Sequence, residues 1–195
     1  MKKLLFISMI GLLALLTSCA SVRYGVKAGP TFATITGDDT DNLDAKVGVF
    51  FGGFAELEVA DMFSIQPELL FSSQGTKYSD SDGFDGKFKL SYLNLPVMAK
   101  VYVSDGFFFE AGPQFGYLLS AKDEYESPGL SGEDDLKDLG LIKDIDVGAN
   151  VGLGYQLDSG LNFGARYNFG LTDVNDFGDF SQKNSVISLL VGFRF

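Results

Sequence analysis

The sequence predicts an all-β protein: a single eight-stranded antiparallel up-and-down transmembrane β-barrel, with short turns at one end and long loops at the other. Three observations favour this fold. Apolar and polar residues alternate with a period of two over most of the chain, the connections between these segments are short and long in turn, and an apolar leader comes first. Period-two alternation indicates strands with one apolar face. Hairpins that are short at one end and long at the other are typical of transmembrane barrels.

The leader occupies residues 1–20. Lys2 and Lys3 precede an apolar run over 4–16, and residues 17–20 read Thr-Ser-Cys-Ala. A charged start, a short apolar run and small residues at its end indicate a secretory signal peptide, and the run is shorter than the roughly 20 residues of a transmembrane helix. Cleavage after Ala20 would leave the barrel domain, 21–195. The same residues also fit a lipobox, in which Cys19 would be lipidated and become the first residue, and both alternatives stay open.

The alternation defines eight segments, at residues 22–34, 45–58, 63–77, 87–103, 107–120, 144–157, 161–172 and 185–195. Short connections fall at 59–62, 104–106 and 158–160, the last two ending in a glycine suited to positive φ. Longer polar connections fall at 35–44, 78–86, 121–143 and 173–184. Pro67, Pro96 and Pro113 lie inside segments, where a proline removes a ladder donor, so we expect bulges or a missing hydrogen bond near them.

The composition of the two faces predicts which one meets lipid. The apolar face carries Phe, Tyr, Leu and Val, while the polar face is mostly Gly, Asn, Ser and Gln and would make a poor solvated exterior, unlike that of a soluble barrel or sandwich. Each segment exceeds the roughly 9–11 residues of a spanning strand, and only a closed sheet leaves no unpaired edge in lipid. The short turns should be periplasmic and the long loops extracellular. Leu153 should face lipid, so that Leu153→Arg impairs assembly, whereas Gly154→Ser on the lumen side should be tolerated.

Charged residues on the inward face predict a closed lumen. An eight-stranded barrel is just wide enough for side chains to fill, and buried charges persist when they are paired. We therefore predict a structural network of ion pairs, with Glu110 or Asp146 as the partner of Arg166; the alternative is a small porin or channel for passive diffusion of small solutes. The predicted network comprises Arg23, Lys27, Glu56, Glu58, Glu68, Lys100, Glu110, Asp146, Arg166 and Arg194.

Composition also excludes several kinds of function. The chain has no His, one Cys and a net charge of -11. Catalysis by a Ser-His or Cys-His pair is therefore excluded, nucleic acid is an unsuitable partner for an acidic surface, and we predict no catalytic, cofactor or metal site. The acidic loops leave weak divalent-cation binding open, since residues 80–85 alternate oxygen-bearing side chains as a calcium loop does but lack its later Glu; the alternative is a solvated loop. We expect a monomer.

Several motifs resemble the porin-family outer-membrane β-barrel domain of Gram-negative envelopes. These are residues 24–29 (Tyr-Gly-Val-Lys-Ala-Gly), 63–75, 92–100, Gly112-Pro113, 148–155, and 166–173. The sequence departs from the family at Asn94, where an acidic residue is frequent, and at Cys19. The resemblance implies an outer-membrane location, outer-membrane lipid and the barrel-assembly machinery as partners, and Phe195 as the terminal aromatic assembly signal. It implies a structural or surface-interaction role and names no ligand.

Overall fold

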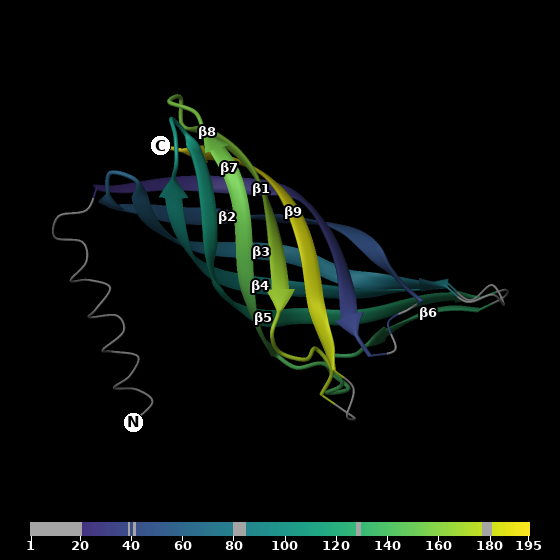
Figure 1. Cartoon of the computed structure of the whole chain (residues 1–195). Helices are drawn as coiled ribbons and strands as arrows, with labels where there is room; N and C mark the ends of the chain where they lie inside the picture. Colours follow the sequence, from purple (N-terminus) through teal and green to yellow (C-terminus); the bar gives the residue numbers. More distant parts are fainter. Residues whose placement is uncertain (1–20, 39, 41, 80–84, 128–129, 177–180) are drawn as a thin grey trace, which may run out of the picture.

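The computed structural model describes residues 21–38, 40, 42–79, 85–127, 130–176 and 181–195 (Figure 1). The predicted leader, Cys19 and residues 80–84 of the calcium-like stretch lie outside them. In the part of the chain so described, no helix is long and apolar enough to cross a membrane.

The described chain forms a closed ring of antiparallel strands. In order around the ring, the pairs are β1–β2, β2–β3, β3–β4, β4–β5, β5–β7, β7–β8, β8–β9 and β9–β1, which confirms the predicted eight-stranded up-and-down barrel. A ninth strand, β6, pairs with β5 outside the ring, and the polar sequence of residues 130–135 gave no sign of it. The strands are β1 (Ser21–Gly37), β2 (Leu43–Ala60), β3 (Phe63–Ser79), β4 (Asp85–Tyr102), β5 (Phe107–Ser127), β6 (Leu130–Asp135), β7 (Ile145–Gln156), β8 (Leu161–Gly170) and β9 (Gln182–Arg194).

The glycine turns lie where the sequence predicts them, but the register shifts of the sheet do not. Gly106 and Gly160, in two of the predicted short turns, have φ values of 81° and 95°, a conformation that glycine adopts without strain. Of the two alternatives expected near the prolines, the bulges are absent, because the ladders run through Pro67, Pro96 and Pro113 without a change of register; the missing proline N–H donor is the alternative that remains. The register shifts lie elsewhere, between Ala45 and Phe50, between Glu58 and Ala60, and at Ser91/Tyr92.

The two faces of the barrel are divided as the alternation predicts. Leu153 is 46% exposed on the outer surface, with similar exposure for Val151, Tyr155 and Phe163. Gly154 faces the lumen, but the expected tolerance of Gly154→Ser is wrong. A Cβ there would lie 2.5 Å from Phe108 Cζ and 2.6 Å from the Phe163 carbonyl oxygen. The glycine therefore makes room for an aromatic ring inside the barrel.

At the long-loop end, strands β3, β4 and β5 continue past the barrel, and β6 joins them in a projecting sheet (Figure 1). On one face of this sheet the rings of Tyr78 and Phe88 lie 5.0 Å apart, and the Tyr78 hydroxyl donates to Asp123 Oδ1 at 2.8 Å. Burial and the Asp123 carboxylate raise the pKa of that hydroxyl, which keeps it a donor. Tyr78 covers Gly86, and Tyr125 covers Gly132 in the same way. These cross-strand contacts stabilise the sheet beyond the barrel wall.

The orientation of the faces is testable on β7 by introducing arginine once on the outer face and once on the inner face. Leu153→Arg should reduce folded protein in the outer membrane, because a lipid-facing cation near the midplane costs about 2–4 kcal/mol. Gln156→Arg should reduce it less: the substitution loses two hydrogen bonds of the buried amide, but Gln156 borders an open vestibule at the short-turn end together with Glu58 and Asp158. Membrane fractionation and the heat-dependent gel shift of the folded barrel measure both. Greater damage from Gln156→Arg than from Leu153→Arg would contradict the orientation.

Candidate functional site

The lumen is the candidate site, because inward-facing side chains of all the barrel strands meet there. Glu68 is the centre of its first cluster, with a side chain that has no exposed surface. Arg166 binds both Glu68 oxygens, at 2.8 and 2.9 Å, and its Nε donates to Glu110 at 2.7 Å. Lys27 Nζ lies 2.8 Å from Glu68 Oε1, and the Gln66 amide donates to the same oxygen. Two carboxylates and two cations from four strands thus neutralise one another in a buried region.

A second cluster surrounds Glu56, whose side chain is also fully buried. Lys100 Nζ and Arg194 Nη1 lie 3.4 and 3.2 Å from Glu56 Oε2, and the Tyr102 hydroxyl donates to Oε1 at 2.5 Å. Lys100 also donates to Gln66 Oε1 at 3.2 Å, so Gln66 bridges the two clusters. Because Glu56 and Glu68 each have several charged or hydroxyl donors, their desolvation is offset by charge-assisted hydrogen bonds.

Aromatic rings complete this layer. Lys27 Nζ lies 5.0 Å from the centre of the Phe54 ring, and Lys100 Nζ lies 4.0 Å from that of Phe108. Both distances are within the range of cation–π attraction. Gly25 and Gly154 stand directly across from these two rings, and a Cβ at either glycine would collide with them. Inward glycines and inward phenylalanines are therefore paired by register.

Three predicted members lie at the edge of the buried clusters or beyond them. Arg23 and Glu58 pair at 3.2 Å at the short-turn mouth, with side chains 47% and 33% exposed, and Arg194 Nη1 of the second cluster lies 4.0 Å from Glu58 Oε1. Asp146 is buried nearer the long-loop end, where Asn184 and Thr172 are its hydrogen-bond partners at 3.3 and 3.5 Å, and it forms no ion pair with any described residue. The suggestion that Asp146 partners Arg166 is wrong. The period-two alternation predicts which face a residue lies on, but the position of that residue along the barrel axis depends on the strand register.

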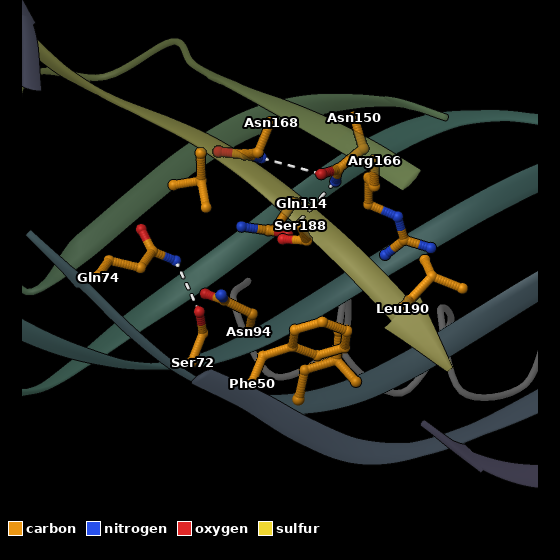
Figure 2. Close-up of a pocket in the computed structure, with 12 residues that line it drawn as sticks. Phe50, Ser72, Gln74, Asn94, Gln114, Asn150, Arg166, Asn168, Ser188 and Leu190 are labelled. Atoms are coloured by element: carbon orange, nitrogen blue, oxygen red, sulfur yellow. Dashed lines mark hydrogen bonds between the residues drawn. The ribbon is translucent and has the colours of Figure 1, made fainter. Parts of the chain in front are cut away.

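Above the clusters lies a small cavity of about 30 Å³. Figure 2 shows amide side chains around it: Gln74 donates to Ser72, and Asn168 donates to Asn150. The side-chain oxygens of Gln74, Asn94 and Asn168 are buried without a protein donor. Part of the lining is apolar, with Phe50, Leu70, Val186 and Leu190, and a cavity of this volume with these polar groups in its lining accommodates one or two water molecules, which would donate to the amide oxygens.

At the long-loop end a cluster of apolar side chains, which we call the plug, packs inside the barrel. Its buried members are Leu90, Tyr92, Leu118, Ala121 and Val174, with Leu136 and Ile142 packed against them. The backbone holds the plug together, since the Lys143 N–H donates to the Val174 carbonyl at 2.8 Å and the Asp176 N–H to the Leu141 carbonyl at 3.0 Å. The sequence prediction of solvated loops over 121–143 and 173–184 missed this plug. The plug could have been predicted only from isolated apolar residues within these polar loops, namely Leu136, Leu141, Ile142 and Val174.

Phe195 and the acidic loops complete the set of predicted site residues. Phe195 is 72% exposed, and its N–H donates to the Tyr24 carbonyl at 2.9 Å. Among the residues described, no three His, Cys, Asp or Glu side chains come together as a metal site would require. Weak cation binding by the acidic loops stays a prediction, because residues 80–84 fall outside that set.

A closed eight-stranded antiparallel ring with an apolar exterior and a filled, ion-paired interior defines a small transmembrane β-barrel protein. The model of the outer membrane protein beta-barrel domain family matches residues 17–176, and the chain belongs to this family. Membership of this family places the protein in the outer membrane and confirms the resemblance identified from the motifs.

Solved structures similar to this chain are small outer-membrane barrels. The attachment invasion locus protein Ail of Yersinia pestis has 16% identity and a TM-score of 0.55, over 89% of this chain and 98% of Ail. Neisserial surface protein A has 15% identity and a TM-score of 0.54, over 90% and 99% of the two chains. A major outer membrane protein of Thermus thermophilus has 14% identity and a TM-score of 0.52, over 90% and 100%. No curated protein matches the chain.

The first cluster makes a testable prediction at Arg166. Arg166→Ala should lower the free energy of unfolding in detergent micelles by about 3–5 kcal/mol, because it leaves Glu68 and Glu110 without their shared cation. Arg194→Ala should cost less, because Glu56 keeps Lys100 and Tyr102. Urea unfolding followed by circular dichroism measures both values. Equal or smaller loss in Arg166→Ala would contradict the central place of Arg166 in the cluster.

Proposed function

We propose that this outer-membrane protein is a closed, non-conducting barrel, monomeric and non-enzymatic, with a structural or surface-interaction role served by the sheet projecting from its long-loop end. The observation that carries the proposal is the filled lumen: an ion-paired layer and an apolar plug lie on either side of a 30 Å³ cavity. In a barrel filled in this way, only the outer surface and the loops are accessible to a partner.

The absence of His from the whole sequence supports a non-enzymatic role. No imidazole is available to activate a serine or to act as acid and base near neutral pH. The charged residues of the two buried clusters are engaged with one another, and their pairing supports a structural role.

The projecting sheet supports the surface-interaction role. Its strand β6 pairs with β5 through six register pairs and lies at the end of the strand order, so it forms an edge of the sheet. An edge strand presents backbone donors and acceptors to a partner. We also propose that the barrel-assembly machinery recognises the C-terminal strand through Phe195, whose exposure at the end of β9 supports such a contact.

Conductance separates this proposal from the small-porin alternative. The purified native protein in a planar bilayer should give no stable single-channel steps, because the ion-paired layer and the plug fill the lumen. The variant Lys27→Ala/Glu68→Ala/Arg166→Ala, which removes three charges of the layer together, should give small, noisy openings. Uniform, reproducible steps from the native protein would overturn the closed barrel and favour a porin.

Surface presentation of the sheet has a separate test. In intact cells a membrane-impermeant maleimide should label Glu133→Cys in β6, because the long loops of such barrels face the exterior. Asp158→Cys, in a short turn, should be labelled only after the outer membrane is permeabilised. The reverse pattern would contradict the proposed surface role, whatever the conductance.

A further inference from the structure

The outer face of the barrel changes composition in ordered steps where β3, β4 and β5 leave the apolar belt. Side chains directly opposite one another on neighbouring strands form rows on this face. The first row is apolar, the second is made of hydroxyls, and the third contains lysines. In the same order, these rows are Phe71, Leu93 and Tyr117; then Ser73, Ser91 and Ser120; then Lys89 and Lys122.

Lysines are concentrated here out of proportion to the acidic chain. Of 15 basic residues, Lys2 and Lys3 belong to the leader, which leaves 13. Five of these are the lumen and mouth residues described above. Four more belong to the outer face of β3–β5, which we call the lysine band: Lys77, Lys87, Lys89 and Lys122.

Like charges face each other within the lysine band. Lys77 stands directly across from Lys87, and Lys89 directly across from Lys122. Directly opposed like charges destabilise a sheet, so both pairs have an unfavourable arrangement that a bound anion would relieve.

Carboxylates neutralise one half of the band. Lys89 pairs with Glu124, and Lys122 pairs with Glu133 at 2.6 Å. All four of these side chains keep roughly a third to a half of their surface exposed, so water screens both pairs.

The other half of the band has no such partner. Lys77 and Lys87 are both exposed, and neither forms an ion pair with a carboxylate that the structure describes. Asp44 lies opposite Lys77 in the register and Glu124 lies opposite Lys87, but Glu124 is engaged by the neighbouring lysine. Two exposed cations are therefore available to an external anion.

Lys46, on β2, is a buried cation beside the lysine band. Its amine donates to Ser73 Oγ at 3.2 Å and to the Gln74 carbonyl at 3.0 Å, and it has no ion-pair partner within the described chain. Lys77, Lys87 and Lys89 of the band lie close enough to this amine to repel its charge, and Glu124 lies close enough to attract it. Positive charge therefore gathers next to the hydroxyl row, whose serines are further hydrogen-bond donors.

We propose that the lysine band and the serine row bind the phosphorylated headgroup of an outer-leaflet lipid. The band is continuous with the lipid-facing belt, so acyl chains on Phe71, Leu93 and Tyr117 would place the headgroup against the serines and lysines. Lysine binds phosphate as a compact charge, and basic clusters at the membrane surface bind anionic headgroups. This inference depends on the outer-membrane location and is independent of whether the lumen conducts.

Diphosphoryl lipid A is a suitable probe because it has two phosphates and many acyl chains. The mature protein, reconstituted in phosphatidylcholine nanodiscs containing lipid A, should retain it after repurification, as measured by mass spectrometry. Lys77→Gln/Lys87→Gln should weaken this binding roughly 25-fold, from about fivefold per lysine near a charged surface. The matched control, Lys143→Gln/Lys183→Gln, removes two lysines of the same end outside the band and should bind as the native protein does.

Thermal unfolding gives a second readout. Without lipid A, Lys77→Gln/Lys87→Gln should be at least as stable as the native protein, because one like-charge contact is gone. With lipid A, the native protein and the control should gain stability, and the band variant should not. Equal binding by all three proteins would overturn the proposal. Equal stabilisation of the native protein by inorganic phosphate alone would overturn the lipid assignment in favour of a free-anion site.

Discussion

Pairing of every backbone N–H and C=O within the hydrocarbon layer is the constraint on which this structure depends. A strand exposed to lipid has no water to satisfy an open edge, so the ring must close between β1 and β9. Closure fixes an inside and an outside, and the period of two then sends alternate side chains to each. The prolines show how strongly closure dominates local preference. Pro67, Pro96 and Pro113 each remove a donor, yet the ladder continues past them in register.

Closure with eight strands leaves an interior that side chains must fill without leaving charges unpaired. The chain meets most of this requirement by placing glycine opposite phenylalanine and cations beside carboxylates; Asp146, which has no ion-pair partner among the described residues, accepts hydrogen bonds from Asn184 and Thr172 instead. Glycine stands across from phenylalanine at Gly25 and Gly154, and the rings so admitted lie beside Lys27 and Lys100. Glu68 and Glu56 each collect donors from several strands. Removing one partner therefore affects strands that are distant in sequence, because the interior ion pairs connect strands on opposite sides of the barrel.

The sequence predicted features that depend on local pattern and missed those that depend on register. The alternation was sufficient to predict the eight strands and the inward position of Glu68 and Arg166, and the glycines were sufficient to predict the short turns. It could not show that Arg166 reaches Glu68 across the barrel, because that contact joins β3 and β8, which are not neighbours in the ring. Asp146 was placed on the correct face but at the wrong height. The plug around Leu118 and Val174 was missed because loop segments have no period, and only their scattered apolar residues mark them.

Arginine and lysine are distributed differently along the chain: arginine occurs only in the lumen or at its mouth, whereas lysine occurs both in the lumen, at Lys27 and Lys100, and on the outside. All three arginines of the chain, Arg23, Arg166 and Arg194, lie in the lumen or at its mouth, where each faces a glutamate. A planar guanidinium binds a carboxylate through two parallel hydrogen bonds and is desolvated more readily than an ammonium group. Outside the lumen the basic residues beyond the leader are all lysines, which retain hydration and adapt to a mobile anion. Buried carboxylates inside favour the guanidinium, which Lys27 and Lys100 supplement, and the lipid phosphates proposed outside would meet lysines alone, so the placement of arginine follows from the closure that separates the two faces.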